Sequence, residues 1–328
     1  MKLSVLGAGS WGTALAQHAA SCGHPVTLYA REPELARAID RDHANPEFLP
    51  GVALARELRG TSDLGEAVAG AEALIVAIPS EFCRTFYRQL TPLAPATAPL
   101  VSATKGLELG SLRRMTEVAA EELPGRPLAA LSGPSFALEV ARGQPSAVVL
   151  ASAHEDALAM LQRALSSRSF RVYGSSDLVG VELAGALKNV IAIAAGILAG
   201  LGYGHNTVAA LITRGLAEMS RLALAKGGRA ETLSGLAGLG DLVLTCTGAL
   251  SRNRALGEAL GRGQSLQEAQ AGTRMVAEGV RTTAAACTLA EQAGVEMPIA
   301  HKMREVLYEG KAPRLALDEL MLRSLKNE

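Results

Sequence analysis

The chain has 328 residues, of which 48% are hydrophobic and only 3% are aromatic. Its 32 Lys and Arg residues balance 32 Asp and Glu residues, so no overall charge favours a nucleic acid or an anionic membrane as partner. The length predicts one large domain or two of ordinary size. The four scattered cysteines form no C-x-x-C pair, which argues against a zinc site or disulfide framework and favours a reducing, cytoplasmic setting: Cys22, Cys83, Cys246 and Cys287.

The first twenty residues have the pattern of a strand, a glycine-rich turn and a helix, and lack the features of a signal peptide. The turn Gly7-Ala8-Gly9-Ser10-Trp11-Gly12 is a G-x-G-x-x-G motif, which in this position predicts a dinucleotide-binding site. Gly7 permits the tight turn, Gly9 lets the backbone approach a pyrophosphate, and Gly12 lets helix and strand pack closely. The N-terminus of the helix supplies N–H donors to the phosphates.

A second strand is predicted at residues 25–30, followed by Arg31 and Glu32. This position lies at about the distance from the glycine turn, ~20 residues, at which such folds contact the adenosine ribose. Arg31 favours the 2′-phosphate of NADP(H), whereas Glu32 could instead bind the 2′-hydroxyl of NAD(H). The alternative is that Arg31 is a solvated charge ahead of the helix that begins near Pro33.

Further buried strands are predicted at residues 73–79, 100–103, 128–131, 147–151 and 170–173, with helices between most of them and a loop at 45–54. This alternation predicts a Rossmann-type, doubly wound parallel sheet in an α/β domain covering residues 1–178.

No strand is predicted after residue 178, so residues 179–328 form an all-helical second domain. The apolar run at 190–201 is shorter than the ~20 residues that span a bilayer, which indicates a buried core helix and no membrane insertion. Helices are expected at about 178–200, 206–226, 231–238, 252–261, 265–271, 280–293, 299–308 and 315–326.

Polar or glycine-rich residues follow four of the predicted strands: Ser10-Trp11, Pro79-Ser80, Lys105 and Gly133-Pro134-Ser135. In an open α/β sheet, ligands bind beyond the carboxyl ends of the strands. Lys105 is therefore expected to face this crevice, although the same placement also suits a surface lysine in a loop.

Lys188 lies inside a long apolar helical run. Burial would lower the pKa of its amine, which suits a proton donor near neutral pH. The alternative is a lysine whose stem packs on apolar surface while its amine reaches water.

Asp241 is an acidic residue in an apolar stretch of the sequence. Ser251 is a good N-cap for the helix that carries Arg252 and Asn253, and such a helix start with an arginine suits a phosphate group. An ordinary capped helix with solvated arginines explains the same pattern. No H-x-x-x-H motif or cluster of aspartates suggests a metal site.

Taken together, these motifs resemble the bacterial-type NAD(P)-dependent sn-glycerol-3-phosphate dehydrogenases. The shared stretches run in order along nearly the whole chain: 7–12 (GAGSWG), 45–51, 103–107 (ATKGL), 131–137 (LSGPSFA), 182–191 (ELAGALKNVI), 236–247 (LAGLGDLVLTCT), 251–254 (SRNR), 276–282 (VAEGVRT) and 297–299. Two small departures are Phe48, where Tyr is usual, and Ser146, where Thr is usual.

The resemblance implies the reversible reduction of dihydroxyacetone phosphate to sn-glycerol 3-phosphate, which feeds glycerophospholipid synthesis. It implies Lys188 as proton donor and acceptor, assisted by Lys105 and Asp241. The implied cofactor contacts, besides Gly7, Gly9 and Gly12, are Ser10, Trp11, Arg31, Lys105, Ala137, Arg252, Val276 and Glu278. With Arg31 after the second strand, we expect NADP in preference to NAD. The implied substrate contacts are Lys105, Gly133, Ser135, Lys188, Asp241, Ser251, Arg252 and Asn253.

We also expect a homodimer. One alternative is a related two-domain reductase or β-hydroxyacid dehydrogenase that acts on a carboxylated substrate. Another is a non-catalytic NADP(H)-sensing module, which the presence of both Lys105 and Lys188 disfavours.

Overall fold

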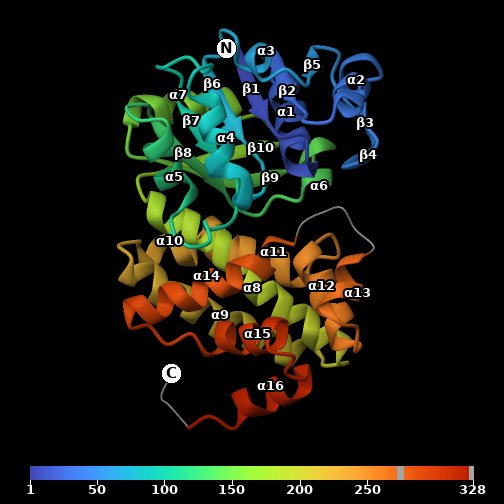
Figure 1. Cartoon of the computed structure of the whole chain (residues 1–328), viewed down its shortest axis with the longest axis vertical. Helices are drawn as coiled ribbons and strands as arrows, with labels where there is room; N and C mark the ends of the chain where they lie inside the picture. Colours follow the sequence, from blue (N-terminus) through green and yellow to red (C-terminus); the bar gives the residue numbers. More distant parts are fainter. Residues whose placement is uncertain (272–276, 325–328) are drawn as a thin grey trace.

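The structure is a computed structural model that describes residues 1–271 and 277–324. A layered half, with a sheet between helices, is stacked on a helical half (Figure 1). Within the described residues, every strand precedes Leu178 and only helices follow, as the sequence predicts.

The sheet has eight strands in the order β10-β9-β8-β7-β6-β1-β2-β5. Their bounds are β1 Leu3–Leu6, β2 Val26–Tyr29, β5 Leu58–Thr61, β6 Ala73–Val76, β7 Leu100–Ser102, β8 Leu128–Ser132, β9 Ser146–Ser152 and β10 Phe170–Ser175. Six neighbouring strands of this sheet, β8-β7-β6-β1-β2-β5, are parallel and have the strand order of dinucleotide-binding sheets. The point where the strand order reverses lies between β1 and β6. The nucleotide crevice is therefore expected beyond the ends of β1 and β6.

Alternate residues of the central strands face two different cores. Leu3 and Val5 of β1 pack with one group of helices, whereas Leu6 packs with the other. Such strands are buried on both faces because helices cover both sides of the sheet. The covering helices are α1 Ser10–Ser21, α2 Pro33–Arg41 and α7 Glu155–Leu165 on one face, and α3 Leu64–Val68, α4 Cys83–Leu90 and α5 Met115–Glu122 on the other.

The structure of this half differs from the sequence-based predictions in three places. The expected loop at 45–54 contains the small antiparallel pair β3 (Ala44–Asn45) and β4 (Leu49–Ala53), and the edge strand β5 was not predicted. β5 reads LRGT and lacks the apolar run that marks a central strand. The sheet is also mixed, because β9 runs antiparallel to β8. The short α6 (Ala137–Ala141) between them lies against α1 and does not form a full crossover.

The helical half consists of α8 Leu178–Gly200, α9 His205–Ala225, α10 Ala230–Ser234, α11 Asp241–Thr247, α12 Arg252–Gly261, α13 Leu266–Ala271, α14 Glu278–Ala293, α15 Pro298–Tyr308 and α16 Pro313–Met321. A π-helical turn, Leu236–Gly240, leads directly into α11. The sequence did not predict α11, which proves important for the site.

Helix α8 joins the two halves. Its first turns pack Val181 against Ala130 of β8 and Ala151 of β9, and its later turns form the centre of the helical core. Among the described helices it alone is long and apolar enough to cross a membrane unbroken, but 89% of its most apolar window is buried inside the protein. Its burial identifies it as a core helix, although the whole helix is longer than the apolar run that the sequence analysis considered.

Helices α8 and α12 cross with their backbones almost in contact. A Cβ on Gly196 of α8 would lie 2.0 Å from the carbonyl oxygen of Arg254, and one on Gly257 of α12 would lie 2.0 Å from that of Ile193. Gly200 and Gly261 make similar approaches one turn further on. These glycines fix the spacing between α8, which carries Lys188, and α12, which begins at Arg252.

Candidate active site

The glycine turn has the geometry that the motif predicts. Gly7 has a φ of 114°, and a Cβ there would lie 2.6 Å from the carbonyl oxygen of Ala77. A Cβ on Gly12 would lie 1.9 Å from the carbonyl oxygen of Gly7. Gly9 is different, since no atom lies within 4 Å of the position of its Cβ. This open space at the N-terminus of α1 fits the pyrophosphate of a dinucleotide.

The β3–β4 pair supports this turn. The buried amide of Asn45 donates hydrogen bonds to the carbonyl oxygen of Ala8 at 2.9 Å and to the hydroxyl of Thr13 at 2.8 Å. The hydroxyl of Ser10 donates to the carbonyl oxygen of Phe48 at 2.7 Å. Asn45 is a supporting residue to which sequence reasoning assigned no role, because its contacts depend on a hairpin that the sequence did not predict.

The other residues predicted to contact the cofactor come from different elements of the chain. Arg31 follows β2, is 79% exposed and forms an ion pair with Glu32 at 2.6 Å. Trp11 is in α1, and Ala137 begins α6. Both pack against the core on the side of the sheet that α1, α2 and α7 cover. Val276 lies outside the described residues.

Glu278, the first residue of α14, bridges the two halves of the protein. Its carboxylate accepts hydrogen bonds from the backbone N–H and the hydroxyl of Ser80, at 3.0 and 2.7 Å. Burial raises the pKa of Glu278, while the Ser80 bonds and the charge of Arg252 act to lower it. Ser80 follows β6, so this contact lies beside the expected nucleotide crevice.

Three predicted catalytic side chains meet where the halves join. Asp241, which is 1% exposed, accepts a hydrogen bond from Lys188 on one carboxylate oxygen and one from Lys105 on the other, the latter at 2.8 Å. Lys188 is only 5% exposed, so it is buried and does not reach out to water. Lys105 also donates to the carbonyl oxygen of Gly133 at 3.0 Å. Ser135 donates to the same carbonyl at 2.9 Å.

The surroundings of Lys188 lower its pKa to about 7. Burial is the main cause, because it disfavours the ammonium form, and the nearby charge of Lys105 acts in the same direction. Asp241 opposes both effects. The pKa of Asp241 itself is lowered, since the two lysines outweigh the raising effect of burial. The amine of Lys188 can therefore exchange a proton near neutral pH.

Thr245 is a member of this cluster that sequence reasoning missed. Lys188 donates to its hydroxyl at 2.8 Å, and this hydroxyl donates in turn to the backbone carbonyl of Asp241 at 2.6 Å. Residues 241 and 245 are one turn apart on α11 and so share a face. Predicting that helix would have indicated the contact.

A chain of amides links Lys105 to the start of α12. Asn189 donates to the backbone carbonyl of Lys105 at 3.3 Å and accepts a hydrogen bond from Asn253 at 3.0 Å. Asn253 accepts in turn from the N–H of Gly279 at 3.0 Å. Asn189 is a second residue to which the sequence gave no individual role.

The start of α12 has the form that the sequence predicts. The Ser251 hydroxyl caps the helix by accepting the N–H of Arg254 at 3.2 Å. The side chain of Arg252 is exposed and, within the described residues, has no hydrogen bond or ion pair. A capped helix start with an unpaired guanidinium is suited to binding a phosphate. In the described part of the chain, no group of three or more His, Cys, Asp or Glu side chains is arranged to hold a metal.

A doubly wound sheet with a glycine turn, followed by a helical half, is the architecture of an NAD(P)-dependent oxidoreductase. Sequence models of the N-terminal and C-terminal parts of NAD-dependent glycerol-3-phosphate dehydrogenase match residues 2–158 and 177–318. The chain belongs to this family of NAD(P)-dependent dehydrogenases.

The relatives support the same assignment. The NAD(P)+ glycerol-3-phosphate dehydrogenase of Geobacter metallireducens is 54% identical over 331 residues, covering 100% of this chain and 98% of that protein. The crystal structure of the Coxiella burnetii glycerol-3-phosphate dehydrogenase superposes with a TM-score of 0.95 at 42% identity, covering 98% of this chain and 99% of that one. A ketopantoate reductase from Ralstonia eutropha shares the fold, with a TM-score of 0.59 at 18% identity and coverage of 98% and 100%.

Proposed function

We propose that this protein reversibly reduces dihydroxyacetone phosphate to sn-glycerol 3-phosphate, a precursor for glycerophospholipid synthesis. The observation that carries the proposal is the buried carboxylate of Asp241, which binds both Lys188 and Lys105 where the two halves meet. Two ammonium groups at one site suit a reaction in which negative charge develops on a carbonyl oxygen.

The proposed phosphate site is the start of α12. The guanidinium of Arg252 and the first N–H groups of the helix would hold the dianionic phosphate through charge-assisted hydrogen bonds. Ser251, Asn253, Gly133 and Ser135 complete the proposed substrate contacts. Since Asn189 connects Asn253 to Lys105, the bound phosphate would be held at a fixed position relative to the lysines.

Lys188 is the proposed proton donor and acceptor. In the reductive direction its ammonium gives a proton to the oxygen on C2 of the substrate, and in the oxidative direction its neutral amine removes that proton. Lys105 stabilises the negative charge that develops on this oxygen. The bound nicotinamide cofactor supplies or accepts the hydride.

The cofactor is proposed to lie along the crevice beyond β1 and β6, with its pyrophosphate at the N-terminus of α1. Arg31 is the proposed contact for the 2′-phosphate, so we propose a preference for NADP(H) over NAD(H). Its present partner Glu32 is partly exposed, and a phosphate dianion would compete for the guanidinium. Ser10 and Trp11 of the glycine turn are further proposed contacts. The remaining ones are Lys105, Ala137, Arg252, Val276 and Glu278.

The experiment that tests this function follows the nicotinamide absorbance with purified protein and NADPH. Oxidation of NADPH should require dihydroxyacetone phosphate and be at least about 100-fold slower with unphosphorylated dihydroxyacetone, because a charged hydrogen-bonding site is then unfilled. An unphosphorylated 2-oxo acid should be a similarly poor substrate. Faster turnover of the 2-oxo acid would overturn the proposal in favour of a reductase for carboxylated substrates.

Three further features are proposed on the strength of the family. We infer a homodimer, which sedimentation would test, and a cytoplasmic location. We also place the domain boundary between residues 178 and 179, at the start of α8.

A further inference from the structure

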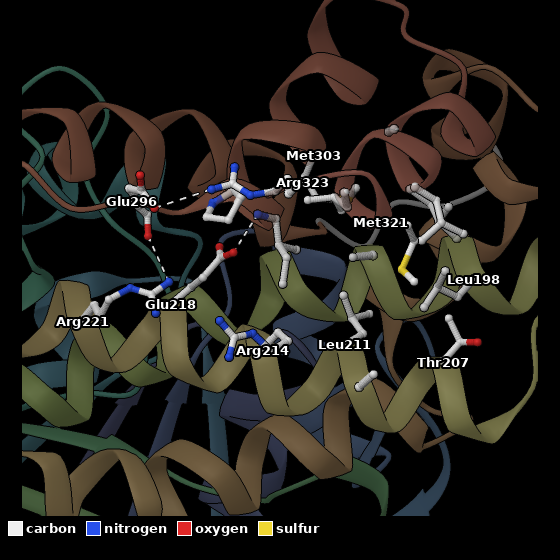
Figure 2. Close-up of a pocket in the computed structure, with 18 of the residues that line it drawn as sticks. Leu198, Thr207, Leu211, Arg214, Glu218, Arg221, Glu296, Met303, Met321 and Arg323 are labelled. Carbon is white, nitrogen blue, oxygen red and sulfur yellow. Dashed lines mark hydrogen bonds and ion pairs between the residues drawn. The ribbon is translucent and has the colours of Figure 1, made fainter. Parts of the chain in front are cut away.

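A cavity lies in the helical half, between α8, α9, α15 and α16 (Figure 2). Its volume is about 930 Å³, within the range of sites that bind small molecules. None of the residues proposed for the reaction lines it. The proposed reaction therefore does not account for this cavity.

The walls of this cavity are mainly hydrocarbon. They are formed by side chains from all four helices, among them Ile197, Leu198, Leu211, Met303, Leu317 and Leu320. At its open side, Leu224 is 49% exposed and Met321 is 75% exposed. Apolar side chains left in water at the mouth of an apolar cavity favour a ligand that covers them with hydrocarbon.

Most of the charged groups that line the cavity already have partners. Glu218, which is 2% exposed, accepts hydrogen bonds from the N–H groups of Ile299 and Ala300, at 2.7 and 3.2 Å, and so caps the start of α15. Glu296 forms an ion pair with Arg323 at 3.5 Å, and its backbone carbonyl accepts a hydrogen bond from Arg221 at 3.1 Å. Figure 2 shows these contacts on one side of the cavity.

Arg214 is the exception. It lies on α9, lines the cavity and is exposed, and within the described residues its guanidinium has no hydrogen bond or ion pair. Figure 2 shows it between the leucines of the cavity and the buried Glu218. An unpaired cation beside a hydrocarbon surface is complementary to a molecule with an anionic group on an apolar chain.

We propose that this cavity binds a single-chain amphiphile with an anionic head group, a long-chain fatty acid or a close analogue. The head group pairs with Arg214, and the chain lies against the leucine and methionine side chains of α8, α9, α15 and α16. This site is separate from the crevice proposed for the reaction, so the proposal does not depend on the identity of the substrate.

The test measures binding of cis-parinaric acid, a fluorescent long-chain fatty acid, at concentrations below its aggregation. The full-length protein should bind it saturably with about one site per chain. Arg214→Gln should weaken binding about tenfold or more, because a charge-assisted pair is lost. The matched variant Arg163→Gln, an exposed arginine on α7 in the other half, should bind as the wild type does. Ala210→Trp fills the cavity from an exposed position and should abolish binding.

A neutral analogue separates the roles of charge and hydrocarbon. The methyl ester of the probe should bind wild type and Arg214→Gln equally well. The proposal is overturned by absence of saturable binding, by an Arg214→Gln variant that binds the acid as tightly as wild type, or by binding that survives in Ala210→Trp. A further outcome overturns the proposal: the wild type binds no fatty acid, and Ala210→Trp lowers the molecular mass of the assembly in solution. The cavity would then be occupied by a second copy of the chain. Circular dichroism confirms that each variant is folded.

Discussion

Lys188 and Asp241 come from different helices, 53 positions apart in the chain, and meet as a buried pair. Asp241 also binds Lys105, which follows a strand of the other half. A carboxylate between two ammonium groups compensates for part of their mutual repulsion and of the cost of burying them. The proposed chemistry depends on this arrangement, because it sets how readily Lys188 gives up its proton.

The pH dependence of the reaction should report the pKa of Lys188, which lies at about 7. Reduction requires the ammonium, so kcat/KM for dihydroxyacetone phosphate should fall as the pH rises through about 7. Oxidation of glycerol 3-phosphate requires the neutral amine, so its kcat/KM should rise over the same interval. Initial rates in both directions, measured between pH 5.5 and 9 in steps of about half a unit, check this expectation.

The variant Asp241→Asn provides the control for that interpretation. Removing the carboxylate removes the group that raises the pKa of Lys188, so the reductive limb should move about one unit or more toward lower pH. If the pH at which kcat/KM for reduction falls does not change in Asp241→Asn, the titrating group is not Lys188.

Arg252 should control the affinity for the phosphate group. Arg252→Ala removes an unpaired guanidinium at the start of α12, and its loss should cost about 1.5–3 kcal/mol of binding, the range for hydrogen bonds to charged groups. KM for dihydroxyacetone phosphate should therefore increase at least about tenfold. Arg262→Ala, at the other end of the same helix and paired with Glu258, is the control. An unchanged KM in Arg252→Ala would exclude the proposed phosphate site.

Arg31 should distinguish the two cofactors. Arg31→Ala should raise KM for NADPH about tenfold while changing KM for NADH less than about twofold, because only NADPH has the 2′-phosphate. Arg37→Ala, which removes the partner of Glu34 on α2, should change neither value. Equal losses for both cofactors in Arg31→Ala would mean that the 2′-phosphate is bound elsewhere.

The crossing of α8 and α12 should tolerate no extra atom. Gly257→Ala places a methyl group 2.0 Å from the carbonyl oxygen of Ile193, so the helices must move apart at a cost of about 3 kcal/mol, at the upper end for overpacking. Urea unfolding measures this loss. The comparison is Gly204→Ala, where no atom lies within 4 Å of the added Cβ. Since Gly204 is the N-cap of α9, that change should cost no more than about 1 kcal/mol. Equal stabilities of the two variants would show that the crossing can relax.

Local patterns predicted much of the fold. The glycine turn, most strands of the sheet and the N-cap Ser251 depend on nearby residues, and the structure confirms them. The strand β5, the β3–β4 pair and the direction of β9 depend on tertiary pairing, which single-sequence patterns do not contain.

Local sequence patterns likewise predicted only part of the candidate site. The sequence singled out Lys188 but left open whether its amine is buried or reaches water, because that depends on which residues pack around it. Its partners Asp241 and Thr245 come from α11, a helix that the pattern did not reveal. Asn45 and Asn189 lie within stretches shared with the family, but their roles depend on hydrogen bonds to distant backbone groups, which the sequence does not show.

The most direct test of the proposed mechanism is the turnover of dihydroxyacetone phosphate by Lys188→Ala at saturating NADPH. Turnover should fall by ~10²–10⁴-fold, the usual contribution of a positioned acid or base. The Kd for NADPH should stay within about twofold of wild type, because Lys188 binds protein groups on α11 and none in the glycine turn. Lys226→Ala, an exposed lysine after α9, should behave as wild type. Turnover within about threefold of wild type in Lys188→Ala would contradict the account, since another group would then supply the proton.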